Sequence, residues 1–570
     1  MTGRVQPIVI FGIDGATHTV LDPLLAQGHL PQLQRLKERG AWGVLRSTIH
    51  PLTPAAWVSM VTGLNPGKHG VYDFRRRQEG SYAWELVNSR SWSGEALWSI
   101  FSQQGWRVGV VNVPMTYPPQ PVNGFMVSGM GAPRQLQGSV YPAQLAALLQ
   151  ERFPDYAVDP EVEHISHAQQ YLAQYVAWVE RRIAVLRLLR EEYPELDFLM
   201  VVFTEIDRIQ HVFWRFLDAS FPDYHTPEAG DVRAQVTGMF RQIDGALGEL
   251  WEWVAERGGH LLVVSDHGFG PLLKDVYINK WLVDHGYLAL KPDVGVGASG
   301  NFFEQVDWEH TRAYSFGFFG NISLNLHGRE PRGIVEPGRQ AEQLKQEIAQ
   351  RLSELTDPES GERVVDAVYR REQLYSGLYV EQAPDLLVVM RDYAYMTRDG
   401  FDFISERLMG PPMEYQRSAL PHSGNHRLEG IVLLAGDGVC PGAAIGPAEI
   451  VEIAPTVLHL ASLPLPADVD GRVLVEAFEA DFLGARQVAY RASAPPAQVV
   501  RNPFRRQLLE KEAQIVLLNQ EIDRLRHDLA EREYTIRAQQ AVIERFKAGR
   551  VMRLLAWLHR MRQQIGRIRH

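Results

Sequence analysis

Short apolar runs alternate with longer amphipathic stretches over residues 1–480. The amphipathic stretches, for example 177–193 and 236–257, repeat apolar positions at helical spacing. The apolar runs carry aliphatic residues at consecutive positions, which is typical of strands buried on both faces. This alternation predicts an α/β fold, a mostly parallel sheet sandwiched by helices. The runs that we expect to form strands are 7–14, 107–114, 196–207, 260–268 and 430–439.

Acidic and imidazole side chains stand where three of these runs end. Asp14 closes the first run, Asp207 closes the third, and Asp266 and His267 lie at the end of the fourth. Ligands of open α/β sheets bind beyond the carboxyl ends of the strands, so we expect these side chains to meet at one edge. Buried carboxylates and imidazoles need a partner. They are therefore either solvated loop residues or ligands of a metal ion.

Two histidines extend this set. His211 follows Asp207 by four residues, a spacing that places both side chains on one helical face and within reach of one ion. The alternative is a helix cap followed by a partly buried histidine. His426 precedes the last apolar run, and we favour it over His422 as a further nitrogen ligand.

Thr53 stands before Pro54 at a predicted helix start, near the positive end of a helix dipole. A threonine alkoxide is a poor species at neutral pH unless a metal lowers the pKa of the hydroxyl. Thr53 is therefore a nucleophile only if a metal lies beside it. The alternative is an ordinary N-cap.

The C-terminal part of the chain has a different pattern. Residues 481–504 lack periodicity and contain adjacent prolines, which predicts a linker. Residues 505–548 predict a coiled coil and a homodimer, or else one long helix packed on the body. Residues 549–570 predict a basic amphipathic helix, suited to an anionic membrane surface, to an acidic partner or to docking on its own coiled coil. The heptad positions are Leu508, Ile515, Ile522, Leu529, Ile536 and Ile543.

Composition narrows the class of protein. The net charge of -10 and the pI near 6.0 argue against a nucleic-acid binder. The single cysteine, Cys440, excludes an internal disulfide framework and a cysteine-rich metal cluster. We find neither a signal-peptide pattern nor an apolar run of membrane-spanning length. A cytoplasmic enzyme, peripheral at a membrane if the basic helix binds one, is the expectation.

Five motifs in this order resemble the type I phosphodiesterase/nucleotide pyrophosphatase branch of the alkaline phosphatase superfamily, in its bacterial form. The similarity spans residues 7–475 and implies an alkaline-phosphatase-like fold, with a smaller cap or insertion at about 270–420. The motifs are "GIDGA", "LTPAAWVSMVTGLNPGKHGVYDF", "TEIDRIQH", "SDHGFG" and "GNHRLEG".

The resemblance implies a phosphohydrolase with two divalent metal ions, zinc or manganese. Asp207, His211 and His426 would hold one ion. Asp14, Asp266 and His267 would hold the other, on which Thr53 would act as the nucleophile. In-line attack on phosphorus would then give a phosphothreonine intermediate. Three carboxylates against two divalent ions leave one positive charge, which would attract a phosphate ester.

One position departs from the family pattern. Nucleotide pyrophosphatases of this branch carry an asparagine shortly after the "HG" segment, whereas this chain has Asp73 and Phe74. Asn325 and Arg329 are the candidate replacements as donors to the phosphate, against ordinary loop contacts.

Two other functions compete with hydrolysis. A phosphomutase or phosphotransferase would share the metal set. A non-catalytic scaffold would use the coiled coil, with the hydrolase domain as a relic. A sulfatase is excluded because its nucleophile position requires a modifiable cysteine or serine.

Overall fold

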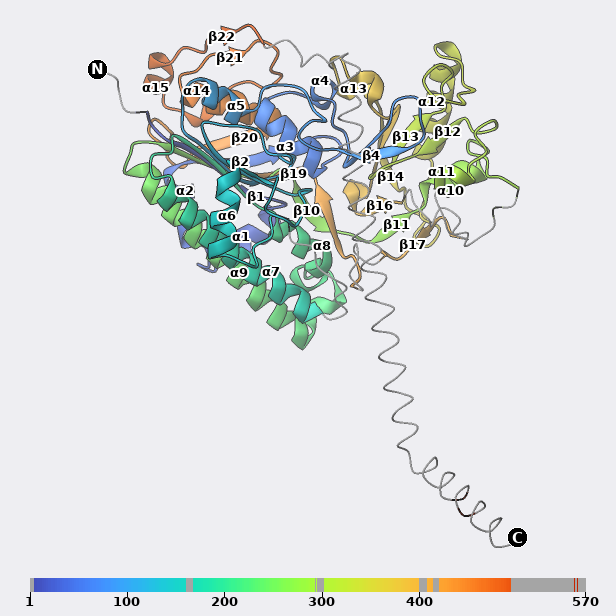
Figure 1. Ribbon diagram of the computed structural model, residues 1–570. Helices are drawn as coiled ribbons and strands as arrows, with labels where there is room; N and C mark the ends of the chain where they lie inside the picture. The colour runs from blue at the N-terminus through green and yellow to red at the C-terminus, as the bar shows by residue number, and fades with distance from the viewer. Residues whose placement is uncertain are drawn as a thin grey trace, which may run out of the picture. The chain divides into compact units, whose positions relative to one another are not determined.

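A nine-stranded sheet forms the centre of the computed structural model (Figure 1). Its strands, in spatial order, are β20 (Ala444–Glu449), β2 (Ala41–Arg46), β19 (Glu429–Gly436), β9 (His260–Val264), β1 (Ile8–Ile13), β8 (Phe198–Phe203), β5 (Val108–Val113), β6 (Gly124–Ser128) and β7 (Val140–Tyr141). All five predicted runs supply a strand, which confirms the α/β class. Strands β9, β1, β8, β5 and β6 are parallel, whereas β19 is antiparallel to both neighbours, so the sheet is mixed.

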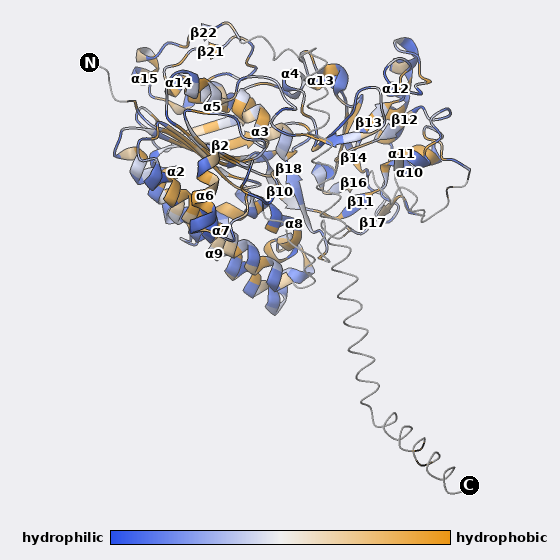
Figure 2. Ribbon diagram, in the orientation of Figure 1, coloured by the Kyte–Doolittle hydropathy of each residue, from blue (hydrophilic) through white to orange (hydrophobic). Residues whose placement is uncertain are grey.

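Side chains alternate between the two faces of the sheet, and each face buries its own apolar core. Val9 and Phe11 of β1 pack in one core, and Ile8 and Ile10 pack in the other. The first core is covered by α1 (His18–Ala26), α2 (Pro31–Arg39), α6 (Ala143–Arg152), α7 (Ala168–Glu192), α8 (Glu205–Leu217) and α9 (Pro227–Ala255). The second is covered by α3 (Thr53–Thr62), α5 (Leu97–Gln103) and α14 (Ile453–Leu460). Figure 2 shows the resulting hydrophobic strands between helices of mixed polarity.

The chain between β10 (Gly268–Pro271) and β18 (Gly424–Arg427), here called the insertion, has a separate core around Trp281, Tyr314 and Leu386. Two small sheets have the orders β12-β13-β15-β14 and β16-β11-β17. Its role as a cap remains a prediction. Its elements are β11 (Lys274–Val276), α10 (Ile278–Asp284), α11 (Phe302–Gln305), β12 (Ala313–Ser315), β13 (Asn321–Leu324), α12 (Arg339–Ser353), β14 (Val365–Arg370), α13 (Arg371–Leu374), β15 (Leu386–Met390), β16 (Tyr395–Thr397) and β17 (Met409–Gly410).

The smaller elements of the main body are α4 (Pro66–His69), β3 (Arg75–Arg77), β4 (Trp84–Leu86), β21 (Leu465–Pro466), α15 (Ala480–Ala485) and β22 (Tyr490–Arg491). Strands β3 and β4 form a hairpin whose Arg77 pairs with Glu330 of the insertion. The polypeptide that follows α3 and α4 is therefore in contact with the insertion.

The structure describes residues 5–159, 168–292, 294, 302–398, 407–413, 420–493, 558 and 561. The chain divides into two compact units, Met1–Ala494 and Pro495–His570. The predicted coiled coil, and the basic helix apart from the exposed helical residues Leu558 and Met561, lie outside the described residues. Within the described part, no helix is both long and apolar enough to cross a bilayer.

Candidate active site

The strand order brings three chain segments to one edge of the sheet. Strand β1 lies between β8 and β9, with Ile13 level with Phe203 and Gly12 level with Val264. Asp14 directly follows β1. Asp207 occupies the first turn of α8, after β8, and Asp266 and His267 follow β9. Parallel strands end at the same edge, which places these side chains together as the sequence predicts.

The first group of ligand atoms centres on His267. Its Nε2 lies 3.5 Å from Asp14 Oδ1 and 3.3 Å from Asp266 Oδ2. All three side chains are fully buried. Gly15 N–H donates to the other oxygen of Asp266 at 3.3 Å, and Trp57 Nε1–H donates to the other oxygen of Asp14 at 3.2 Å. These two bonds orient the carboxylates toward His267.

The second group centres on Asp207. Its Oδ1 lies 3.1 Å from His426 Nε2, 3.4 Å from His211 Nε2 and 3.9 Å from His267 Nε2. The two histidines of α8 and β18 are themselves close, with 3.0 Å between His211 Nε2 and His426 Nε2. The structure therefore brings together all six residues that the sequence suggests as metal ligands.

The donor set fits divalent cations. Ligand atoms of Asp14, Asp266 and His267 lie within 4.8 Å of one another, as do those of Asp207, His267 and His426. Among the described residues, Asp14 Oδ1, Asp207 Oδ1 and Asp266 Oδ2 accept no hydrogen bond although they are buried. An unpaired buried carboxylate oxygen is strongly destabilising unless a cation neutralises it. Mixed nitrogen and oxygen donors suit zinc or manganese.

Electrostatics support this fit. Burial, together with the nearby carboxylates, raises the pKa of Asp14 well above its usual value, and burial and Asp207 raise the pKa of Asp266 to about 8. Burial also opposes ionisation of Asp207, but His211 and His426 outweigh it and hold its pKa well below the usual value. Burial lowers the pKa of His211 and of His267, which favours the neutral imidazole that binds metals.

Thr53 lies at this cluster. Helix α3 begins at Thr53, its N-cap residue is Leu52, and the Thr53 hydroxyl lies 3.5 Å from His267 Nε2. Thr53 is therefore the first helical residue rather than the N-cap. The side chain is buried, and it lies beside His267, which the resemblance assigns to the same metal ion.

His426 and His422 have different positions. Strand β18 pairs with β10 so that His426 lies opposite Phe269, and His426 Nδ1 lies 2.7 Å from the Pro51 carbonyl. A donor at Nδ1 leaves the Nε2 lone pair free for a metal. His422 instead contacts His211, with 2.8 Å between His422 Nε2 and His211 Nδ1. His422 is therefore a neighbour of the candidate ligand His211 and not itself a member of the cluster.

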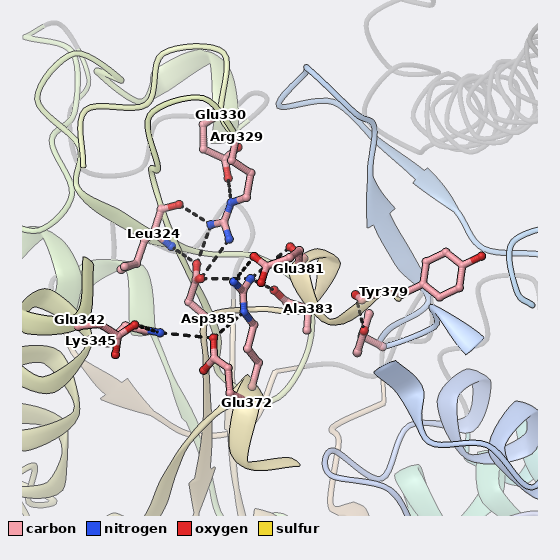
Figure 3. A network of polar contacts seen from close by, with 12 residues as sticks. Leu324, Arg329, Glu330, Glu342, Lys345, Glu372, Tyr379, Glu381, Ala383 and Asp385 are labelled. Atoms are coloured by element: carbon pink, nitrogen blue, oxygen red, sulfur yellow. Dashed lines mark hydrogen bonds and ion pairs between the residues drawn. The ribbon is translucent and has the colours of Figure 1, made fainter. Parts of the chain in front are cut away.

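Asn325 and Arg329 make other contacts. Arg329 forms a two-point ion pair with Asp385, at 3.0 and 2.6 Å, and a further bond to Glu330 (Figure 3). Asn325 is fully buried and donates to the carbonyls of Trp308, Thr311 and Arg332. Both side chains thus stabilise the insertion. The structure does not bring either of them to the Asp/His cluster.

Asp73 has a structural role in place of the family asparagine. Its Oδ2 accepts from the backbone N–H of Phe318 at 2.7 Å, and its Oδ1 accepts from Arg75 N–H at 3.3 Å. A Cβ at Gly317 would lie 2.3 Å from Asp73 Oδ2. Asp73 therefore fixes the 317–321 loop of the insertion.

Trp57 is a site residue that the motif analysis did not identify. It follows Thr53 by four residues, so both side chains lie on one face of α3, and its indole donates to Asp14. The spacing of Thr53 and Trp57 can be read from the sequence. The bond from Trp57 to Asp14 depends on the packing of α3 against the end of β1, which no local pattern marks.

The chain is similar to known phosphoester hydrolases. A family model described as Type I phosphodiesterase / nucleotide pyrophosphatase matches residues 8–402. Among solved structures, the chain is similar to phosphonoacetate hydrolase from Sinorhizobium meliloti 1021, crystallised in complex with phosphonoformate. The identity is 18%, the match covers 76% of this chain and 90% of that chain, and the TM-score is 0.46. No curated protein shows a significant match.

Proposed function

The chain belongs to the type I phosphodiesterase/nucleotide pyrophosphatase family of phosphoester hydrolases, and from this premise we propose that it is a two-metal phosphodiesterase with Thr53 as its nucleophile. One observation carries the proposal. Three buried carboxylates, each with an unpaired oxygen, converge with three histidines beside the Thr53 hydroxyl.

The six ligands divide between two ions. Asp207, His211 and His426 would hold one, and Asp14, Asp266 and His267 would hold the other, with Thr53 beside it. When bound, a pair of zinc or manganese ions supplies positive charge that lowers the pKa of a hydroxyl and neutralises phosphate oxygens. The position of His267 within reach of both groups supports a compact pair.

Thr53 would carry out the substitution. Its Oγ forms a bond to phosphorus in line with the leaving group, whose bond to phosphorus breaks and which departs as an alcohol with the proton that the hydroxyl loses. The product is a phosphothreonine that still carries the second ester group of the substrate. Water then hydrolyses this intermediate and restores the hydroxyl. The N-terminus of the ten-residue helix α3 places backbone N–H groups and the positive end of the helix dipole next to the reacting phosphoryl group.

Turnover of model substrates tests the proposal. Metal-loaded protein should hydrolyse bis-p-nitrophenyl phosphate faster than p-nitrophenyl phosphate. Thr53→Ala should abolish turnover while the bound metal, measured by elemental analysis, stays near the wild-type level. Thr53→Ser should retain part of the activity because it keeps a hydroxyl. Full activity of Thr53→Ala would disprove the assignment of the nucleophile.

Product analysis separates the alternatives. A phosphomutase would return the phosphoryl group to a substrate that has a second hydroxyl, which gives an isomerised product and no stable release of phosphate. A scaffold would bind little metal and turn over neither substrate.

The C-terminal heptads support a dimer. Deletion of 505–570 should give a monomer with intact activity on small substrates. An unchanged oligomeric state would contradict the coiled-coil proposal. We place the enzyme in the cytoplasm, with residues 549–570 as its contact to an anionic membrane surface or acidic partner.

A further inference from the structure

The five residues that end at Thr53 are held from several sides. Tyr375 O–H donates to the Ile49 carbonyl, and the Tyr393 hydroxyl lies 3.3 Å from His50 Nδ1. The Pro51 carbonyl contacts His426 Nδ1, as described above. Both tyrosines belong to the insertion, so it holds two consecutive residues of the segment that presents the nucleophile.

The Tyr393–His50 contact has a preferred direction. Burial raises the pKa of Tyr393 well above its usual value and lowers the pKa of His50 to about 3, so the phenol stays protonated and the imidazole stays neutral. If Tyr393 donates to Nδ1, the phenol proton is bonded, and within the described residues the Nε2 of His50 is the one remaining position of this pair without a protein partner. The opposite direction leaves the phenol proton unbonded as well. Tyr393 as donor is therefore favoured.

Tyr393 lies in an unusual turn. Arg391, Asp392 and Tyr393 have φ values of 50°, 48° and 62°, in the left-handed region that non-glycine residues rarely adopt. Residues on both sides of His426 hold this turn. Asn425 Nδ2–H donates to the Tyr393 carbonyl at 2.8 Å, and Arg427 lies 3.4 Å from the Asp392 carboxylate. Such conformations persist only where surrounding contacts impose them.

The ring of Phe319 contacts the rings of Tyr393, His50 and His426. The Phe319 ring packs against Tyr393 at 5.2 Å between centroids, against His50 at 5.8 Å and against His426 at 5.9 Å. The left-handed turn therefore contacts the nucleophile segment and the β18 segment at the same time.

We propose that Tyr375 and Tyr393 form a tyrosine clamp, a pair of positioning residues through which the insertion sets the place of Thr53 relative to His426. The clamp acts on the Ile49 carbonyl and on the His50 side chain, and not on the substrate. Its effect on catalysis rests on the proposed function of Thr53, whereas its effect on the segment does not.

The test uses the full-length metal-loaded protein and three variants. Tyr375→Phe and Tyr393→Phe each remove one hydroxyl and keep the ring. Tyr287→Phe is the matched control, because Tyr287 is a buried tyrosine of the insertion whose hydroxyl donates to Glu347 at 2.8 Å, away from the clamp. The measurements are kcat and KM for bis-p-nitrophenyl phosphate, metal content, and hydrogen–deuterium exchange of peptides that cover 49–53.

A clamp predicts a specific pattern. Each clamp variant should lower kcat about tenfold, because a small displacement of a reacting group slows the step, while KM and metal content stay unchanged. Exchange in 49–53 should become faster in both clamp variants and remain as in wild type in Tyr287→Phe. A merely structural role would lower the melting temperature without this selective loss of kcat.

Two results would overturn the clamp. One is a kcat within twofold of the Tyr287→Phe value in both clamp variants of an active enzyme. The other is unchanged exchange in 49–53. If wild type hydrolyses neither phosphate ester, the proposed function fails, and exchange alone then decides for or against the clamp.

Discussion

The imidazole of His267 stacks on that of His426, with 3.6 Å between ring centroids and 18° between ring planes. His267 follows β9, and His426 lies on β18, which comes after the insertion in the chain. The stacked rings therefore join the end of a parallel strand to β18. His267 belongs to both sets of candidate ligands, the one with Asp14 and Asp266 and the one with Asp207 and His426. The stacked pair would therefore lie between the two proposed ions.

The first prediction concerns metal stoichiometry. His426→Ala should bind about one equivalent of metal fewer than wild type, because it removes a proposed nitrogen ligand of one ion. His422→Ala should keep the metal stoichiometry and weaken the affinity for metal about 10- to 100-fold, because His422 contacts the proposed ligand His211 and is not itself a proposed ligand. Elemental analysis after dialysis and calorimetric titration measure both effects.

The two variants control for each other, since both remove a buried imidazole from the same short stretch of chain. Equal metal loss in both would contradict the assignment of His426. If His422→Ala alone bound one equivalent of metal fewer, His422 would be the ligand and His426 its neighbour.

The second prediction concerns removal of the metal. Chelation should lower the melting temperature, because Asp14, Asp207 and Asp266 would then face one another without a neutralising cation. A ligand present at 100 times its Kd stabilises a folded protein by about 2.7 kcal/mol. Differential scanning calorimetry with and without EDTA measures the shift. Asp266→Asn should narrow the difference between the melting temperatures with and without EDTA, since it removes one of the proposed metal ligands. An identical melting temperature in all cases would exclude a metal-filled site.

The sequence was sufficient where chemistry follows local pattern. Asp14, Asp207 and Asp266 each stand at the end of an apolar run, and the rule for parallel strands brings them together. It was insufficient where a role depends on distant contacts. Arg329 looks like a phosphate ligand in sequence, but it is neutralised by Asp385, to which β13 and β15 bring it. Tyr393 carries no motif, and its position depends on a left-handed turn that no local pattern marks.

The third prediction concerns the loop that Asp73 anchors. Gly317 has φ +89°, and a Cβ there would lie 2.3 Å from the Asp73 carboxylate. Gly317→Ala should destabilise the protein by about 1–3 kcal/mol from backbone strain, with a further loss from the clash. Gly328 is the matched control, because it has φ +82° and no atom within 4 Å of its Cβ position.

Urea unfolding compares these two variants. The difference between their transition midpoints isolates the clash from the strain that they share. Equal midpoints would show that Asp73 moves aside freely, which would contradict its role as the anchor of the loop.

The last prediction concerns pH. Burial opposes ionisation of Asp385, but Arg329 outweighs it and lowers the pKa of Asp385. A depressed pKa in the folded state contributes stability above the unfolded pKa of about 3.9, and this stability is lost as pH falls below that value. Asp385→Asn removes the two-point partner of the half-buried Arg329, which keeps its bond to Glu330, and should cost about 1.5–3 kcal/mol near pH 7. Urea unfolding should show a difference from wild type that narrows below about pH 4, and a pH-independent difference would exclude the ion pair as its cause.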